Sequence, residues 1–364
     1  MKKIIAKTSE GSYSVIIGSN SFLHLQNEII KQKLFQNILV IIDENVRKFY
    51  AKDILNIFND FPLKLEIFVL KSGESSKSNH ELQKIYSALI KNKYSRDSLI
   101  IAIGGGVTGD ISAYAASTFM RGIQLVHIPT TLLSDVDSSI GGKTGINFDK
   151  MKNMIGTFYQ PRLVLIDPNF LITLPDDEML SGLGEIIKYN FITNNQFYDY
   201  TYKNLDKILL KRKSVLEKII YESVLFKTSV VAADEKEKGI RKILNFGHTF
   251  AHAFESELNF KIKHGEAVIA GIISALFLSH LKGYLEEKMV KKFLADIRKV
   301  KLSSLIQNIS TENVLNIMQS DKKKRDNKIK FVLIKNIGEI VTEVEANMSE
   351  IAETIFLMKK NLNN

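Results

Sequence analysis

The first half of the chain alternates short apolar runs with stretches of helical spacing. The apolar runs at residues 38–42, 65–70, 99–103, 125–128 and 163–166 have the length and composition of buried strands. Continuous apolar runs separated by helices are typical of a parallel sheet that is covered on both faces. We therefore predict an N-terminal α/β domain that extends to about Pro175.

After Pro175 the strand-like runs mostly disappear, and the spacing predicts helices over residues 178–190, 214–233, 248–256 and 266–280. A late strand pair is predicted at residues 329–334 and 339–344, on either side of a turn signal at residues 336–338. The predicted fold class is therefore α/β plus α. A Rossmann-like domain would cover residues 1–175, and a mainly helical domain would cover residues 176–364.

The longest apolar stretch covers residues 267–278 and is shorter than the about 20 residues that span a bilayer. The N-terminal segment loses its apolar character at Lys7, which is too early for a secretory signal. We expect no membrane segment and a cytoplasmic location.

Composition and charge limit the kinds of metal site and ligand that the chain can have. The chain has 364 residues, no cysteine, 7 histidines and a formal net charge of +10. Without cysteine there can be no disulfide or thiolate zinc site, so a metal would need His, Asp or Glu ligands. The positive charge suits either nucleic acid or small phosphorylated anions. The chain lacks the interleaved basic and aromatic residues of a base-stacking surface, so the sequence favours a small anion.

A glycine-rich segment, residues 104–110, follows the predicted strand at 99–103 and satisfies the pattern G-x-G-x-x-G. Glycines in such a loop let the backbone approach a pyrophosphate, and the following helix supplies N–H donors. The acidic residue that usually holds the ribose about 20 residues later is missing. Asp43, directly after the strand at 38–42, is a candidate for that role. A tight strand-to-helix turn without a ligand is the alternative interpretation.

Three histidines, His248, His252 and His264, lie close together in the sequence. His248 and His252 share a helix face because they are four residues apart. The glutamate that follows the first histidine in zinc metalloproteases is absent, which disfavours that class. Glu185 with two imidazoles would form a three-ligand site with an open position for water or substrate. Histidines with a structural or surface role are the alternative.

Lys143 lies in the segment Gly-Gly-Lys-Thr-Gly, which is similar to part of a phosphate-binding loop but lacks the first glycine of that motif. The basic residues 322–325 are most simply a solvated charge run. A site for a phosphate and a carboxylate would need several such cations.

Taken together, these segments resemble the 3-dehydroquinate synthase family of NAD-dependent cyclases. The similarity extends from about Asp43 to Gly338. The segments whose order and spacing match the family are residues 73–77, 104–110, 129–133, 135–144, 184–188, 241–249, 264–268 and 321–324. Two departures occur, because Gly184 stands where Ala is usual and Ala251 where Gly is usual.

The resemblance implies a divalent metal, zinc or cobalt, on Glu185, His248 and His264. It implies proton acceptors at Glu237 and His252, and a catalytic role for Lys143. The implied substrate-binding positions are Arg121, Asp137, Lys143, Asn153, Glu185, Lys188, Lys227, Arg241, Asn245, His248, His264 and Lys323. The implied NAD-binding positions are Asp43, Glu44, Asn45, Glu74, Lys77, Gly105, Gly106, Val107, Thr108, Gly109, Asp110, Thr130, Thr131, Lys143, Lys152, Phe170, Leu171, Ile172 and Thr173.

The implied reaction converts 3-deoxy-D-arabino-heptulosonate 7-phosphate to 3-dehydroquinate and phosphate in the shikimate pathway. Its steps are transient oxidation by NAD, phosphate elimination, re-reduction and aldol cyclisation. A homodimer is also implied, with Arg121 reaching the neighbouring site. A sugar-phosphate cyclase with another substrate and a metal-dependent polyol dehydrogenase share this architecture and stand as alternatives.

Overall fold

The computed structural model describes residues 1–32, 37–59, 64–149, 151–322 and 329–362. The chain forms two compact units, the first comprising Met1–Pro175 and Leu210–Lys236 and the second comprising Asp176–Leu209 and Glu237–Asn364. From the sequence we expected a single boundary after Pro175. The chain does divide there, but residues 210–236 belong to the first unit. Helix α8 (Lys213–Ala233) packs against β1 and β2, and helical spacing alone does not show which element a helix covers.

The first unit is built on a seven-stranded sheet in the order β1-β2-β9-β6-β5-β3-β4. Its strands are β1 (Lys2–Thr8), β2 (Gly11–Ile17), β3 (Asn37–Asp43), β4 (Lys64–Leu70), β5 (Leu99–Gly104), β6 (Gln124–Pro129) and β9 (Leu163–Ile166). All pairs are parallel except β1 with β2. The five strands expected from the sequence are confirmed. The β1–β2 hairpin was not foreseen, because β1 buries only Ile4 and Ala6 and leaves Ile5 and its three lysines exposed.

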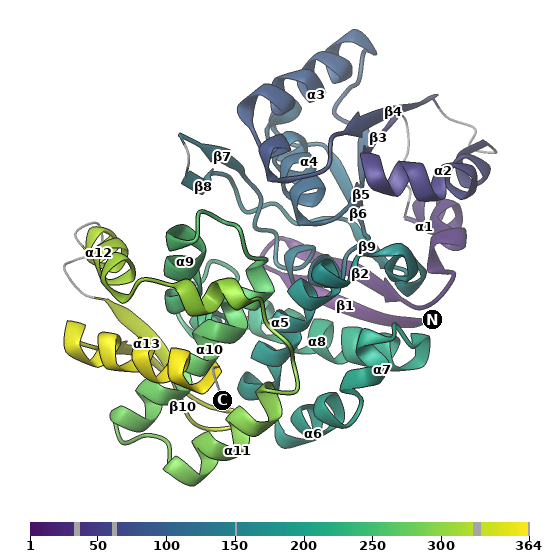
Figure 1. The fold of residues 1–364 in the computed structure, drawn as a ribbon. Helices are drawn as coiled ribbons and strands as arrows, with labels where there is room; N and C mark the ends of the chain where they lie inside the picture. Colours follow the sequence, from purple (N-terminus) through teal and green to yellow (C-terminus); the bar gives the residue numbers. More distant parts are fainter. Residues whose placement is uncertain (33–36, 60–63, 150, 323–328, 363–364) are drawn as a thin grey trace. The chain divides into compact units, whose positions relative to one another are not determined.

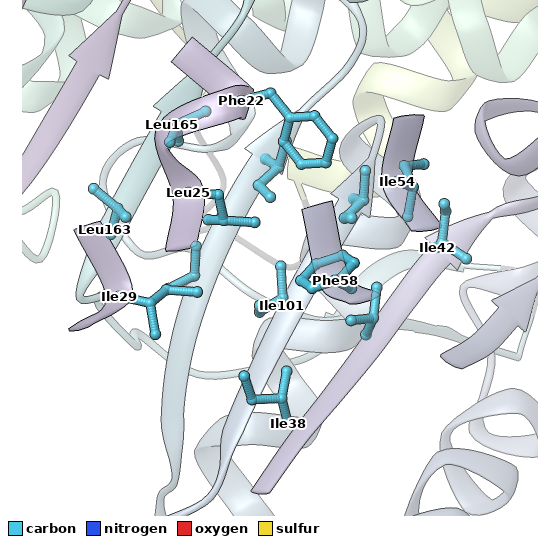
Figure 2. Packing of buried hydrophobic residues seen from close by; sticks show 14 of the residues in the cluster. Phe22, Leu25, Ile29, Ile38, Ile42, Ile54, Phe58, Ile101, Leu163 and Leu165 are labelled. Atoms are coloured by element: carbon cyan, nitrogen blue, oxygen red, sulfur yellow. The ribbon is translucent and has the colours of Figure 1, made fainter. Parts of the chain in front are cut away.

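The central strands are apolar at nearly every position because both faces of the sheet are covered. Ile38, Val40 and Ile42 of β3 face one side, where they pack with residues from η1 (Ser21–His24), α1 (Leu25–Lys31) and α2 (Glu44–Asn59) (Figure 2). Leu39 and Ile41 face the other side, against α3 (Asn79–Lys91) and α4 (Gly106–Thr118) (Figure 1). The two-residue period of a strand divides one apolar run between two cores.

The six strands β2, β9, β6, β5, β3 and β4 all run parallel to one another. The loops at their carboxyl ends therefore meet along one edge of the sheet. These loops carry the turn η2 (Glu74–Ser76), the start of α4, the π-helical turn η4 (Ser134–Ser138) and η5 (Pro168–Thr173). Beyond η4 the chain forms a hairpin from β7 (Ile146–Phe148) and β8 (Met151–Ile155). The turn η3 (Phe119–Arg121) follows α4.

The second unit is mainly helical, as expected. Its elements are α5 (Asp176–Ile192), α6 (Asn195–Lys203), α7 (Leu205–Leu209), η6 (Ile240–Asn245), α9 (His248–Glu257), α10 (His264–Leu281), α11 (Glu287–Ile297), η7 (Ser304–Asn308), α12 (Thr311–Lys322), β10 (Lys330–Asn336), β11 (Glu339–Glu345) and α13 (Met348–Leu362). The predicted late strand pair is confirmed as an antiparallel hairpin. Helix α10 contacts α5, α9, α11, α13 and β10, and is therefore the centre of this unit.

By length and composition, α10 is the one helix among the described residues that is apolar enough to cross a membrane. Of its apolar window, 78% is buried inside the structure. A helix that is hydrophobic all round and packed on every side is a core helix. Its composition therefore reflects its central place in the second unit.

Glycines let α10 touch its neighbours backbone to backbone. A Cβ at Gly265 would lie 2.0 Å from the Ser181 carbonyl oxygen, and one at Gly184 would lie 2.3 Å from the Gly265 oxygen. A Cβ at Gly271 would lie 2.2 Å from the Gly247 oxygen. No side chain fits at such distances, so these positions require glycine for helix packing.

The substitution Gly271→Ala tests this close crossing. The added methyl group must push α9 away from α10, so we expect it to lower the free energy of unfolding by about 1–3 kcal/mol or more. Gly109→Ala is the matched control, since its Cβ would make an ordinary contact at 3.5 Å with the His127 ring. Alanine also favours a helix by roughly 0.5–1 kcal/mol over glycine. Urea denaturation should show a loss for the first variant only, and equal stability of both would contradict the packing argument.

Candidate functional site

The glycine loop joins β5 to α4 at the carboxyl edge of the first unit's sheet. A Cβ at Gly104 would lie 2.6 Å from Thr108, so this glycine is needed for the turn itself. Gly105 precedes the first residue of α4, and a Cβ there would lie 2.9 Å from Thr131. Gly106 faces Ser138 of η4, which its Cβ would approach to 3.2 Å. The loop therefore brings the N-terminus of a 13-residue helix beside Thr131, and such a helix start favours an anion.

Asp43, at the end of β3, has a structural role that the sequence did not reveal. Its Oδ1 accepts hydrogen bonds from the Asn45 backbone N–H at 2.9 Å and from the Ser72 hydroxyl at 2.8 Å. It therefore stabilises the start of α2, where Glu44 is the first helical residue. Its carboxylate is held at the sheet edge by these bonds.

A buried lysine network links three elements at the same edge. Lys77 is 5% exposed, and its Nζ donates to Asp110 of α4 and to the side-chain oxygen of Asn153 on β8. Asn147, which is not among the predicted positions, donates to Glu74 at 2.7 Å and accepts from the Asn153 N–H at 2.9 Å. Burial raises the pKa of Asp110, and the Lys77 charge opposes part of that rise. The structure thus brings together four of the predicted positions, Glu74, Lys77, Asp110 and Asn153.

Asp137 and Lys227, both predicted to bind substrate, form an ion pair with each other in the first unit. Lys227 Nζ donates to Asp137 Oδ1 and to the Asp137 carbonyl oxygen, each at 2.7 Å. The lysine lies on α8 and is almost fully buried, whereas Asp137 lies in η4. Packing of α8 against η4 therefore sets this pair, which explains why residues 210–236 group with the first unit.

The other predicted positions of the first unit differ in burial and lie in several elements. Arg121, Lys143 and Lys152 are exposed, in η3, in the loop before β7 and on β8. Thr130 is buried directly after β6. In η5, Phe170 and Leu171 are core residues, whereas Ile172 is exposed and the Thr173 hydroxyl lies 3.0 Å from the Tyr50 hydroxyl. Val107 and Thr108 belong to the first turn of α4.

Three potential metal ligands converge in the second unit. Glu185 of α5 is fully buried, and its Oε1 lies 3.4 Å from His248 Nε2 and 3.3 Å from His264 Nε2. One ligand atom from each residue lies within 4.8 Å of the others. Lys188, one turn along α5, forms an ion pair with the second carboxylate oxygen. One oxygen of Glu185 therefore faces the imidazoles, and the other is neutralised by Lys188.

The far nitrogens of both imidazoles have hydrogen-bond acceptors. His248 Nδ1 lies 3.2 Å from the Phe246 carbonyl oxygen, and His264 Nδ1 lies 3.3 Å from Glu255 Oε2. Because a carbonyl only accepts, Nδ1 of His248 carries the proton, and a neutral ring then presents its lone pair at Nε2. This arrangement is typical of histidines that bind a metal through Nε2. The donor set, one carboxylate and two oriented imidazoles, fits a divalent cation such as zinc or cobalt.

Electrostatics at this centre favour the charged forms of Glu185 and His264. Burial acts to raise the pKa of Glu185, but Lys188, His248 and His264 outweigh it and hold the pKa well below its usual range. Burial acts to lower the pKa of His264, but hydrogen bonds to Glu185 and Glu255 outweigh it and raise the pKa to about 10. A bound cation would thus replace a proton between the same groups.

Further predicted residues surround this centre within the second unit. His252 is exposed on α9, with its ring centroid 5.5 Å from that of His248 and 6.4 Å from that of His264. Asn245 donates to Glu237 at 2.6 Å, and Arg241 of η6 is buried. Lys323 lies outside the described residues. Sequence reasoning missed Glu255, although its position seven residues after His248 places it on the same helix face.

The close crossings of α10 explain why these ligands meet. Glu185 follows Gly184, and His264, the first residue of α10, precedes Gly265. The backbones of α5 and α10 touch at these two glycines, so the adjacent ligands are brought together. His248 begins α9 directly after Gly247, which contacts α10 in the same way.

Two solved enzyme structures share this fold. The crystal structure of a 2-deoxy-scyllo-inosose synthase complexed with carbaglucose-6-phosphate, NAD+ and Co2+ superposes with a TM-score of 0.87 at 24% identity, covering 97% of this chain and 99% of that one. A 2-epi-5-epi-valiolone synthase from Streptomyces hygroscopicus, with NAD+ and Zn2+ bound, gives a TM-score of 0.86 at 24% identity, covering 98% and 99%.

The sequence comparisons identify the family to which the chain belongs. Residues 67–181 match the family model of the 3-dehydroquinate synthase N-terminal region, and residues 182–324 match that of the 3-dehydroquinate synthase C-terminal region. A 3-dehydroquinate synthase from Pelagibacter ubique is 42% identical over 368 residues, covering 98% of both chains. The chain belongs to the 3-dehydroquinate synthase family, and the resemblance stated from its motifs is confirmed.

Asp135, two residues before the paired Asp137, should make the stability of the folded chain depend on pH. It is fully buried, and within the described part of the chain neither carboxylate oxygen has a hydrogen-bond partner. Burial, together with the charge of Asp167, raises the pKa of Asp135 well above its usual value. A raised pKa in the folded state means that this group's contribution to stability is lost as pH rises from about 4 through the folded-state pKa.

We therefore expect Asp135→Asn to be more stable than the unchanged chain at pH 7, because the amide never has to take up a proton on folding. Each unit of raised pKa corresponds to about 1.4 kcal/mol. The advantage should shrink toward pH 4, where the unfolded aspartate is itself half protonated. Urea denaturation at several pH values measures the difference. A pH-independent difference would contradict the assignment of a protonated, buried Asp135.

Proposed function

We propose that this chain converts 3-deoxy-D-arabino-heptulosonate 7-phosphate to 3-dehydroquinate and phosphate, as a step of the shikimate pathway. The observation that carries the proposal is the convergence of Glu185, His248 and His264 in a chain that is 42% identical to a 3-dehydroquinate synthase over 98% of its length. Neither a nucleic-acid-binding protein nor a metalloprotease would account for that ligand set together with the glycine loop at residues 104–110.

The first unit is proposed to hold NAD at the carboxyl edge of its sheet. The pyrophosphate would lie at the start of α4, where Gly105 and Gly106 leave room for it and the first-turn N–H groups supply donors. Asp43, Lys77 and Thr130 are proposed contacts at neighbouring strand ends, with the other NAD positions implied by the resemblance. The cofactor would take up a hydride and return it within one turnover, so no net reduction follows.

The second unit is proposed to hold one divalent cation on Glu185, His248 and His264. The two solved cyclase structures compared above contain Co2+ and Zn2+, respectively, beside NAD+. Both metals suit a carboxylate with two imidazoles. The cation would act as a Lewis acid that polarises an oxygen of the substrate.

The chain's own cations are proposed to neutralise the phosphate and carboxylate of the substrate. Lys188 and Arg241 are buried in the second unit, and Lys227 is buried in the first. Buried cations interact with an anion more strongly than exposed ones do, because water screens them less. Lys143, Arg121 and Lys323 are proposed to complete this set, and Asp137, Asn153 and Asn245 to bind hydroxyl groups.

Two residues near the metal centre are proposed to accept protons. His252 is exposed beside His248 and His264, so its ring is accessible to substrate and water. Glu237 is held by the Asn245 amide at 2.6 Å. Proton removal next to a transiently oxidised carbon is what makes departure of the phosphate feasible, and positioned imidazole and carboxylate groups are suited to it.

The decisive experiment incubates the purified chain with the heptulosonate phosphate, NAD and Zn2+ or Co2+. We expect phosphate and 3-dehydroquinate in equal amounts and no accumulation of NADH. His264→Ala should lose metal and activity together, because two remaining ligands form a poor site. Stoichiometric NADH would indicate a dehydrogenase, and release of phosphate with a different carbocycle would indicate another cyclase.

Lys143→Ala tests a residue that the sequence pattern alone supported weakly. If Lys143 contacts an anionic group of the desolvated substrate, its loss should cost about 2–4 kcal/mol, or roughly 30–1000-fold in kcat/KM. Metal content and fold should not change. An exposed loop lysine with no such contact would contribute ~0–1 kcal/mol, so a loss of less than about threefold would remove Lys143 from the site.

We also propose a cytoplasmic homodimer. Phe148, Met154 and Phe158, on and after the β7–β8 hairpin, are exposed apolar side chains that a second copy is suited to cover. Sedimentation at a mass of one subunit, 41.3 kDa, would contradict the dimer.

A further inference from the structure

The two imidazoles of the metal centre are supported by different acceptors. His248 Nδ1 faces the neutral carbonyl of Phe246 at 3.2 Å, whereas His264 Nδ1 faces the carboxylate of Glu255 at 3.3 Å. A carboxylate accepts a stronger hydrogen bond than a carbonyl and makes the opposite ring nitrogen a stronger donor to a metal. The two histidines are therefore unequal ligands, and the difference comes from Glu255.

The placement of Glu255 is enforced by the fold. It lies on α9 seven residues after His248, so the ligand and the supporting carboxylate project from one face of one helix. Its side chain is only 6% exposed, and a carboxylate at such a depth needs partners that balance its charge. His264 starts α10, where contact of Gly265 with α5 limits any shift of the backbone. Both ends of the hydrogen bond are thus fixed.

We propose that Glu255 is a positioning residue that sets the metal affinity of this centre without being a ligand. By accepting the Nδ1–H of His264, it keeps the lone pair on Nε2, holds the ring toward Glu185 and strengthens His264 as a donor. This inference rests on the metal centre proposed above. Substitution of a residue that hydrogen-bonds to a metal ligand in this way typically lowers metal affinity by about 10–100-fold.

The experiment titrates the metal-free full-length chain with Co2+ and follows the visible absorption of the bound ion, with a competing chelator to obtain Kd. Glu255→Gln keeps the shape and an accepting oxygen but removes the charge, and should weaken binding by about tenfold. Glu255→Ala removes the acceptor and should weaken it further. The matched control is Glu257→Gln on the same helix, which retains the oxygen that accepts from the Ser310 N–H at 3.2 Å and should bind as the unchanged chain does.

A second measurement separates positioning from a general loss of structure. Proton NMR of the Co2+-loaded chain should show two exchangeable, strongly shifted imidazole N–H signals, one from each ligand histidine. In Glu255→Gln the His264 signal should move or broaden through faster exchange, while the His248 signal should remain. A merely structural role would leave both signals in place or move both together.

The outcomes distinguish this inference from the proposed function. If the unchanged chain binds Co2+ and both Glu255 variants bind it as tightly with unaltered spectra, the role of Glu255 is wrong and the metal centre stands. If the unchanged chain gives no Co2+ absorption, or gives one that His264→Ala does not abolish, the proposed metal centre is wrong. The proposed role of Glu255 is then wrong as well. A graded loss from glutamate to glutamine to alanine, with an unaffected Glu257→Gln, supports the proposal.

Discussion

The buried carboxylate of Glu185 is the constraint on which the second unit depends. A charge removed from water is costly unless opposite charges and hydrogen bonds surround it. Here Lys188 neutralises one oxygen while His248 and His264 face the other, and these groups come from three helices. They can meet only if the helices approach closely, and glycine makes that approach possible at residues 184, 247, 265 and 271. The requirement for glycine at these four positions thus follows from the charged groups that lie beside them.

The two units are proposed to hold their ligands by different physical means. In the first unit the proposed cofactor edge is formed largely by backbone: parallel strands end together, a glycine turn follows, and a helix begins. In the second unit the site is formed by side chains whose charges balance one another. Backbone sites tolerate changes in sequence as long as the glycines and the strand order persist.

Buried lysines also connect elements within the first unit that are far apart in the sequence. Lys227 reaches Asp137 across 90 residues, and Lys77 reaches Asn153 across 76. Each lysine is buried, so each needs its oxygen partners in the folded state. These pairs preorganise polar groups at the proposed substrate and cofactor positions before any ligand arrives. Preorganised charge avoids part of the cost of ordering the site on binding.

The sequence by itself determined much of the architecture. Apolar runs such as residues 38–42 must be buried on both faces, and this periodic requirement is local, so the central strands and the main helices could be predicted. The proposed metal ligands Glu185, His248 and His264 and the glycine loop were also recognisable, because their motifs are specific in order and spacing. The β1–β2 hairpin was not predicted, because a strand such as β1 with only two buried apolar positions is a weak signal.

Only the tertiary structure decided which of these elements come together. The packing of α8 on the first unit's sheet could not be predicted, because an apolar helix face does not specify its partner. The pairing of Lys227 with Asp137 follows from that packing. Glu255 carried no recognisable motif, and its contact with His264 exists only because α9 and α10 cross at Gly247 and Gly271. Spacing along a chain determines which side chains share a face, whereas contacts between faces depend on how closely the backbones can approach.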